Sequence, residues 1–238
     1  MASSLCTNLP FLSPPYPSSS NPKPSTTTRT SFPVQCGPRD NRGPLVKGRV
    51  LSTEAILAIQ ALKRAHRSNP AKVPDVLSKS FPRLVKSDLI AAFKELLRQN
   101  QCGLAADVFS VVRSEPWYRT DLSLYAVLVA AMGRNRMREE IDGLICDLEA
   151  EGEGSIPCDD KGIVQVLRAV LGADRVGSAV RIYGMMKRSG WGSDWVGNEI
   201  VVRVLSKGLR RLGEVGVADE VVREYVRLLK GNLEILEV

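Results

Sequence analysis

Few side chains in this sequence of 238 residues have the types and spacing that enzyme chemistry needs. The chain has one histidine, His66, which rules out mechanisms and metal sites that need two, including two-histidine zinc sites and facial-triad iron. Neither H-x-E nor C-x-x-C occurs, and a zinc-dependent deaminase needs both. We therefore expect no catalytic activity, no metal and no cofactor.

The cysteines likewise indicate no metal site and no redox site. Three of the five follow residue 36, at Cys102, Cys146 and Cys158, and their separations of 44 and 12 residues match no zinc or redox pattern. An odd number of cysteines in a reducing compartment indicates free thiols.

Basic side chains are the better candidates for function, because they recur on single faces of predicted helices. Residues spaced by four or seven lie on one side of a helix, and a positive side attracts polyanions. The candidates are Arg203, Lys207 and Arg210; Lys94 with Arg98; and Lys63 with Arg67. Arg134, Arg136 and Arg138 additionally cluster in one predicted turn between helices. An ordinary solvated surface is the better explanation of any single one of them, so the hypothesis depends on their recurrence.

The charge is also distributed unevenly along the chain. Residues 37–138 carry 18 basic and 8 acidic side chains, whereas residues 139–238 carry 13 basic and 18 acidic ones. This division predicts that the front half binds polyanions and that the rear half largely does not bind them. Charged and polar residues interrupt every 18-residue stretch, so no membrane span is expected.

The first 36 residues have the composition of a targeting segment. They contain thirteen Ser or Thr, seven Pro, two basic residues and no acid, and the prolines interrupt the apolar run of a secretory signal. This favours a transit peptide over a disordered cytosolic tail, with a processing site near Cys36 and a linker over 37–49. Scarce arginine favours the chloroplast stroma over the mitochondrion.

From Val50 onward, apolar residues recur every three or four positions, which predicts helices throughout. Ser52 and Ser87 are candidate N-caps, and Asn69-Pro70 and Pro74 are predicted to end the first helix.

Helix pairs recur at a nearly fixed period. Asp121, Asp159 and Asp194 close successive units and are separated by 38 and 35 residues. In each second helix, a small or aliphatic residue precedes a larger apolar one by four. These are Ala105 and Phe109, Ile141 and Ile145, Ala179 and Tyr183, and Ala218 and Val222. The units are 50–85, 86–121, 122–159, 160–194 and 195–230, with a tail over 231–238. An all-α solenoid of four to five helix pairs is predicted.

Residues 175–194 resemble the second half of a pentatricopeptide (PPR) repeat, with Ala179, Met186, Gly190 and Asp194 at the spacing of that family. The W-x2-L-G-x2-Y first helix of tetratricopeptide repeats is missing.

Further stretches over Asp121–Tyr125, Lys47–Ile56 and Glu115–Asp121 resemble short plant members of the PPR family, and the resemblance extends to about residue 230. It implies a right-handed α-solenoid that binds single-stranded plastid intron RNA, with no catalytic activity, and helps group II introns to splice. Other splicing factors are possible partners, and the protein is expected to be a monomer or an RNA-dependent dimer.

In this family, a polar residue of the first helix and the residue that closes the repeat read one base. The corresponding residues are Ala126 with Asp159, Val164 with Asp194, and Glu199. Ala and Val cannot hydrogen-bond a base, so we expect a weak sequence preference and a large ionic contribution. The aspartates are equally well explained as helix caps.

Two other features leave alternatives open. The tryptophans Trp117, Trp191 and Trp195 fall between units, where packing is favoured over base stacking. The acidic run over 139–153 predicts either a solvated outer surface or a site for a basic splicing partner. A helical scaffold that binds only proteins remains the alternative function.

Overall fold

The structure is a computed structural model that describes residues 51–191, 195 and 198–236, with only the backbone given for 231–236. Its elements are α1 (Thr53–Ser68), a 3-10 turn (Pro70–Lys72), α2 (Val73–Ser80), α3 (Lys86–Arg98), α4 (Cys102–Ser114), α5 (Leu122–Arg134), α6 (Arg138–Glu151), α7 (Asp160–Gly172), α8 (Val176–Arg188), α9 (Glu199–Arg211) and α10 (Val215–Leu236). The predicted transit peptide 1–36, the linker 37–49 and Asp194 lie outside the described residues.

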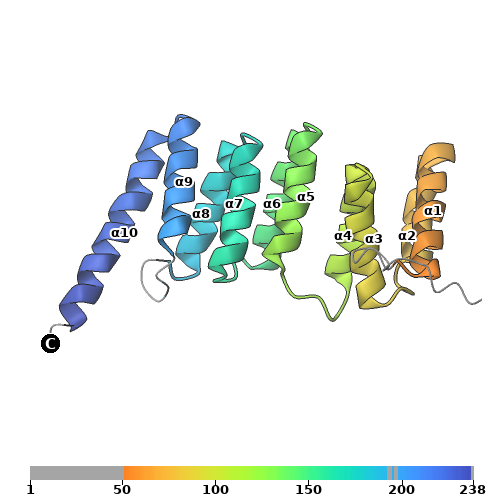
Figure 1. Ribbon diagram of the computed structural model, residues 1–238, viewed down its shortest axis with the longest axis horizontal. Helices are drawn as coiled ribbons and strands as arrows, with labels where there is room; N and C mark the ends of the chain where they lie inside the picture. The colour runs from red at the N-terminus through yellow and green to blue at the C-terminus, as the bar shows by residue number, and fades with distance from the viewer. Residues whose placement is uncertain (1–50, 192–194, 196–197, 237–238) are drawn as a thin grey trace, which may run out of the picture. The chain divides into compact units, whose positions relative to one another are not determined.

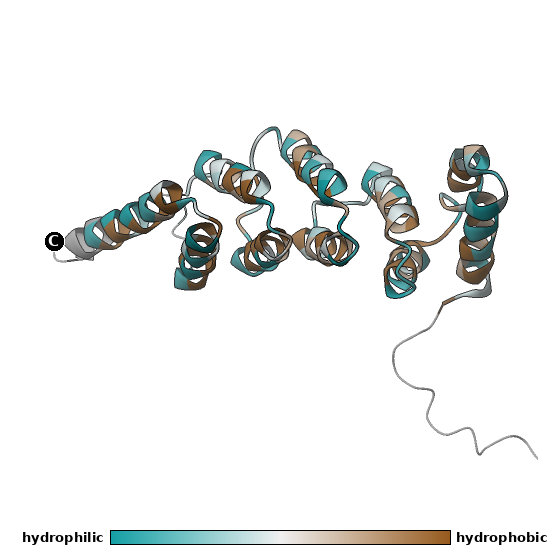
Figure 2. Ribbon diagram, turned by 90° about the horizontal axis from the view of Figure 1, so that it is seen from above, coloured by the Kyte–Doolittle hydropathy of each residue, from teal (hydrophilic) through white to brown (hydrophobic). Residues whose placement is uncertain are grey.

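The helices form five pairs, one for each predicted unit, from α1 with α2 to α9 with α10 (Figure 1). Figure 2 shows the first helices of the pairs in one row and the second helices in another. Within these rows α5 packs on α7, α7 packs on α9, and α6 packs on α8. The described residues contain one isolated extended bridge and otherwise only helices and turns, so the all-α prediction is confirmed.

Contact between successive pairs is uneven along the stack. The first helices α5 and α7 share a long interface, whereas α3 and α5 scarcely touch. The second and third pairs are joined mainly by α4, where the Phe109 ring packs edge-on against Tyr125 with ring centroids 4.9 Å apart.

The predicted inter-helix contact positions form the core. Both members of the pairs beginning at Ala105, Ile141 and Ala179 are buried, and Ala218 is buried with Val222 partly so. Each helix pair leaves an apolar face uncovered, so neighbouring pairs must stack to bury it.

Two of the unit-closing aspartates cap the first helix of the next pair. Asp121 accepts a hydrogen bond from the Ser123 N–H at 2.9 Å, and Asp159 accepts one from the Lys161 N–H at 3.2 Å. These bonds satisfy N–H groups that have no partner inside the helix. The interpretation of both aspartates as caps is therefore confirmed.

The first helices end in turns of the same conformation. Asn100, Arg136, Asp174 and Gly213 follow α3, α5, α7 and α9, and each has φ between 56° and 94°. Asn, Asp and Gly adopt this left-handed conformation at low cost, whereas Arg136 has no such preference. The turns give a fixed reference point for aligning the pairs.

Three local predictions need comment. Ser52 caps α1 as predicted, accepting from the Ala55 N–H at 3.1 Å. Ser87 is not a cap, because α3 begins one residue earlier and Val85 precedes it. Pro74 does not exclude a helix, because it lies in the first turn of α2, where no intrahelical N–H donor is needed.

The last helix also differs from the prediction. The backbone of residues 231–236 continues α10, so most of the predicted tail over 231–238 is helical.

Candidate nucleic-acid interface

The first helices α3, α5, α7 and α9 have the same length of 13 residues, so their positions can be compared directly. Positions five, nine and thirteen are spaced by four and share one face. In chain order, position five holds Ile90, Ala126, Val164 and Arg203; position nine holds Lys94, Ala130, Arg168 and Lys207; and position thirteen holds Arg98, Arg134, Gly172 and Arg211. Seven of these twelve side chains are basic, and none is acidic.

This face is hollowed between α7 and α9. One pocket of about 350 Å³ is lined by Arg168, Leu171, Gly172, Arg203, Val204, Lys207, Gly208 and Arg211. A second of about 370 Å³ is lined by Asp160, Lys161, Val164, Gln165, Arg168, Asn198 and Ile200. The two share Arg168, and we call them together the α7–α9 groove.

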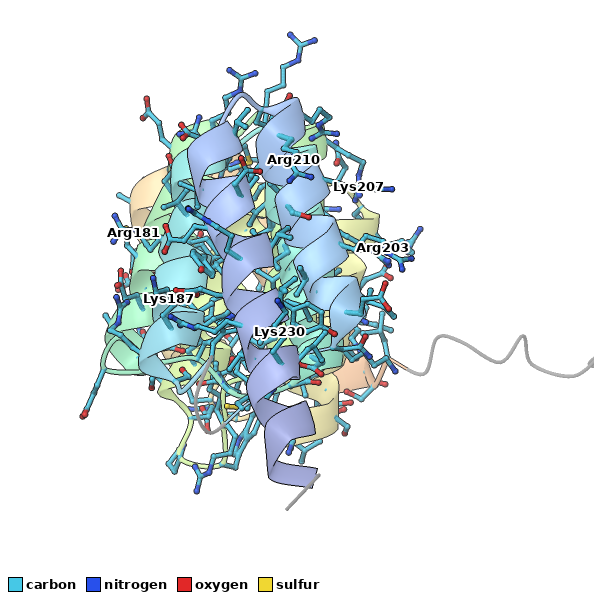
Figure 3. All side chains as sticks on the ribbon, turned by 90° about the vertical axis from the view of Figure 1, so that its left-hand side faces the viewer. Arg181, Lys187, Arg203, Lys207, Arg210 and Lys230 are labelled. Atoms are coloured by element: carbon cyan, nitrogen blue, oxygen red, sulfur yellow. The ribbon has the colours of Figure 1, made fainter. Side chains whose placement is uncertain are left out.

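The groove combines cations with an apolar floor. Five basic residues line it, against the single carboxylate of Asp160. Gly208 allows the close approach of α9 to α7, because a Cβ there would overlap Leu171. In Figure 3, Arg203 and Lys207 project from α9 on the side opposite Arg181 and Lys187 of the second helices.

Three of the groove cations have no anionic partner. Lys161, Arg168 and Lys207 are exposed and form no ion pair within the described part of the chain. Arg203 pairs with the exposed Glu199 one turn earlier. Arg211 binds the Leu171 carbonyl oxygen and lies 3.3 Å from Asp174. Exposed pairs of this kind contribute about 0–1 kcal/mol, so a phosphate can replace the carboxylates.

The other predicted basic residues divide into available and occupied ones. Lys94, Arg134 and Arg136 are exposed and have no ion pair among the described residues. Arg98 is held by both carboxylate oxygens of the buried Glu95, and hydrogen bonding to that carboxylate raises the pKa of Arg98.

On α1, the two predicted cations form hydrogen bonds with residues near them. Lys63 donates to the Gln99 side chain at 2.6 Å, and Arg67 donates to the Lys63 carbonyl oxygen at 3.2 Å. Neither cation has an ion pair among the described residues, so α1 keeps its positive charge, but both side chains are already hydrogen-bonded.

Arg210 is placed differently from the other two members of its predicted triplet. It lies outside the groove lining and pairs with Asp219 of α10 at 2.8 Å. The sequence pattern missed Lys161, Arg168 and Arg211, which do line the groove. Counting nine residues into α7 from its cap Asp159 would have identified Arg168.

The structure also revises the residues that were predicted to read bases. Ala126 and Val164 both occupy position five, but with 6% and 8% of their surface exposed they offer little to a ligand. Glu199 occupies position one of α9, and Arg203 occupies position five. The prediction for the last unit was therefore placed one turn too early, because the connection before α9 changes the spacing. Asp159 is a cap, and Asp194 is outside the described residues.

The tryptophans lie away from this groove. Trp117 is partly buried with the Lys86 amino group 4.8 Å from its ring centre, and Trp191 is 5% exposed and packs edge-on against Trp195. This arrangement favours packing over base stacking.

The acidic run on α6 is largely neutralised by neighbouring helices. Asp147 and Glu151 pair with Arg113 at 2.8 and 3.0 Å. Asp142 binds Arg175, and its hydrogen bond with that guanidinium lowers the pKa of the carboxyl. A basic partner would have to displace these ion pairs.

Glu149 of the same helix binds Arg181 and Arg188 of α8, and hydrogen bonding to Arg181 lowers the pKa of Glu149. The negative charge of the rear half is thus held in the second-helix row, while its first helices remain basic. Within the rear half, the charge therefore also differs between the two rows.

The described residues contain no cluster of three or more metal-ligating side chains, and no described helix is long and apolar enough to cross a membrane. The cysteines Cys102, Cys146 and Cys158 are free thiols.

No protein-family model matches the chain. It is 50% identical over 194 residues to Protein THYLAKOID ASSEMBLY 8, chloroplastic, of Arabidopsis thaliana, covering 81% of the chain and 85% of that protein. It is 30% identical over 139 residues to a pentatricopeptide repeat-containing protein of the same plant, covering 58% of the chain and 69% of that protein.

A solved structure also matches, the crystal structure of THA8 in complex with Zm4 RNA. Its TM-score is 0.65 and its sequence identity 34%, over 75% of this chain and 96% of that one. None of these relatives bears the name of an enzyme, and one is named as a pentatricopeptide repeat protein, in agreement with the prediction that the chain is not an enzyme.

Proposed function

Because the chain belongs to the pentatricopeptide repeat family that includes Thylakoid Assembly 8, we propose that it binds single-stranded RNA in the chloroplast and acts there as a non-catalytic splicing factor for group II introns. The observation that carries the proposal is the basic α7–α9 groove. The crystallised complex of the relative THA8 with RNA supports the same class of ligand.

The groove chemistry suits a phosphate backbone. Arg168 and Lys207 have no carboxylate to give up, and the pairs of Arg203 and Arg211 are solvent-exposed. Lys and Arg gain affinity for nucleic acids by releasing the counterions of phosphates. Ionic contacts therefore supply most of the affinity, and we expect it to fall steeply as salt rises.

Sequence preference is expected to be weak. The side chains at position five of α5 and α7 are apolar and nearly buried, so they cannot hydrogen-bond a base edge. Arg203 at the same position of α9 adds a cation that a phosphate or a base can approach.

The relatives are not named as enzymes, so we infer that the protein contributes by holding a strand and not by cutting or ligating it. A few nucleotides of an intron loop or junction, kept single-stranded in the groove, would favour the splicing-competent fold of an RNA that supplies its own chemistry. Other splicing factors complete the reaction, and the protein works as a monomer or as an RNA-dependent dimer.

We place the mature protein in the chloroplast stroma. The name of the 50% identical relative describes it as chloroplastic, and residues 1–36 have a transit-peptide composition. The intact mass of the protein isolated from chloroplasts tests this, and a start near Gly37 is expected. A protein that keeps Met1 would remove the targeting argument.

The splicing role is tested by depleting the protein and restoring it as variants. The groove variant carries Arg168→Ala, Arg203→Ala and Lys207→Ala. The first-pair control removes three exposed basic residues far from the groove, namely Lys72, Lys79 and Arg83. Unspliced plastid transcripts should accumulate with the groove variant and return to normal with the control.

Immunoprecipitation followed by RNA sequencing gives the second measurement. Intron RNA should be recovered with the wild type and the control, and lost with the groove variant. Normal splicing in the depleted plant would refute the splicing role alone. Equal recovery of RNA with both variants would place the RNA elsewhere, and no RNA with any form would favour the protein-binding scaffold.

A further inference from the structure

The second helices are joined to one another by a repeated arrangement of charges. In α4, Arg113 lies over the Phe109 ring at 5.6 Å from its centroid and pairs with Asp147 and Glu151 of α6. The cation follows the ring residue by four positions, and the two carboxylates are also four apart. Residues four apart lie on one face of a helix.

The same arrangement occurs between α8 and α10. Lys187 lies 5.3 Å from the Tyr183 ring centroid and pairs with Glu220 at 2.7 Å and with Glu224 at 3.3 Å. Tyr183 additionally donates a hydrogen bond from its hydroxyl to Glu224 at 2.5 Å.

Between α6 and α8 the charges are exchanged. Glu149 occupies the position that Arg113 and Lys187 occupy in their helices, eight residues after the buried contact residue, and it receives Arg181 and Arg188. In each of these junctions, the charge at this position is paired by the helix that follows.

The last helix breaks the pattern. The matching residue of α10, eight after Ala218, is Val226, which is 43% exposed. Val222 and Leu229 lie on the same stripe, at spacings of four and three, and Leu229 is 42% exposed. An apolar stripe therefore occupies the face onto which another second helix would pack.

The charge beside this stripe is positive. Asp219, Glu220 and Glu224 of α10 are paired with Arg210 and Lys187. Three cations stay exposed on the neighbouring stripe and form no ion pair within the described residues, namely Arg223, Arg227 and Lys230. Figure 3 looks onto this end of the stack, with α10 in front and Lys230 labelled on it.

We propose that this face of α10, the terminal face (Val222, Arg223, Val226, Arg227, Leu229 and Lys230), docks an amphipathic helix of another protein that carries carboxylates four residues apart beside an apolar stripe. Such a helix would be held by ion pairs, as α6 is joined to α4 and α10 is joined to α8. The inference goes beyond RNA binding, because it assigns a protein-binding surface on the other row of helices.

Charge and side-chain type favour this occupant over two others. A second copy packed through the same face would bring two sets of cations together, and like charges across an interface are unfavourable. RNA would find aliphatic side chains here, whereas single strands are held by aromatic side chains on which bases stack.

The test uses a labelled synthetic peptide with the sequence of α6, residues 138–151, which carries Asp147 and Glu151 and an apolar stripe. It is added to the 15N-labelled full-length protein and followed by amide chemical shifts. The matched control peptide has Asp147→Lys and Glu151→Lys. We expect saturable shifts on α10 with the first peptide and none with the control.

Variants of the protein define the surface. Val226→Asp and the double change Arg223→Glu with Arg227→Glu should each lower the affinity for the peptide by about tenfold or more, equivalent to about 1.4 kcal/mol of binding free energy. Because these side chains are exposed, the unfolding midpoint should stay unchanged in both variants, which excludes misfolding as the cause.

Other outcomes would overturn the inference. Shifts that avoid α10, or equal binding of both peptides, would remove the acidic-helix partner. Sedimentation showing a dimer that Val226→Asp dissociates would assign the face to a second copy. A loss of RNA affinity in the Arg223→Glu, Arg227→Glu variant as large as that of the groove variant would assign it to RNA. Normal RNA affinity with no peptide binding would refute this inference and leave the proposed function intact.

Discussion

Removing three cations from the α7–α9 groove should change the salt dependence of RNA binding by an amount that the structure allows us to calculate. Five basic residues line the groove, namely Lys161, Arg168, Arg203, Lys207 and Arg211. At about 0.7 units of slope for each phosphate contact on a single strand, five contacts give a slope of log K against log salt of about −3.5, and two give about −1.4.

Between 50 and 200 mM salt, these slopes correspond to losses in affinity of about 130-fold for the wild type and about sevenfold for the groove variant. Both are upper limits, because Arg203 and Arg211 are already paired with Glu199 and Asp174. The lower charge should weaken binding to all sequences about equally, since phosphate contacts carry no sequence information.

Fluorescence anisotropy with a labelled single-stranded oligonucleotide from a plastid group II intron measures both slopes. The first-pair control loses the same number of charges and should keep the wild-type slope. The groove assignment would be refuted by an unchanged slope in the groove variant, or by an equal reduction in the control. A large loss for one sequence and none for another would refute the expectation of weak sequence preference.

Three further predictions concern stability and the helix caps. Gly208→Val should lower the free energy of unfolding by about 1–3 kcal/mol, because the new side chain would overlap Leu171, whose Cδ2 lies within 2.8 Å of an added Cβ. Urea denaturation measures this loss, and unchanged stability would contradict the close packing of α9 on α7. Asp159→Ala should lower the free energy of unfolding by about 0.5–2 kcal/mol through loss of the helix cap, and it should leave the base preference of RNA binding unchanged. An altered base preference in RNA-binding selections would restore the base-reading role of Asp159. Since Arg175 lowers the pKa of Asp142 in the folded protein, this carboxylate stabilises the fold above its unfolded pKa of about 4 and loses that effect as the pH falls. Asp142→Asn should therefore reduce the loss of stability between neutral and acidic pH, and parallel curves of urea midpoint against pH for the two proteins would contradict this.

Much of the fold could be predicted from sequence, because the apolar period and the unit-closing aspartates are local signals. Asp121 and Asp159 mark the starts of α5 and α7 by their own hydrogen bonds. Asn198 caps α9 in the same way, accepting from the Ile200 N–H at 2.9 Å, but it is not an aspartate. Continuing the series of aspartates to Asp194 therefore placed the start of this helix one turn too early and directed attention to Glu199 instead of Arg203.

The site was harder to predict, because charge along a chain does not report which charges are already paired. The acidic run over 139–153 reads as an open negative surface, yet Asp142, Asp147, Glu149 and Glu151 are bound to arginines more than 30 residues away in sequence. Arg210 reads as part of a basic face, but its partner Asp219 lies on the next helix. Such pairings require the stacking of the helices to be known.

The sparse contact between α3 and α5 divides the stack energetically. In repeat arrays the coupling between neighbours sets how far folding cooperates, and a weak junction lets one side open while the other stays closed. Helices α1–α4 can therefore unfold together as one unit, and the connection around Pro116 is the boundary of that unit. The α7–α9 groove lies beyond this boundary, so its geometry persists when the first two helix pairs unfold.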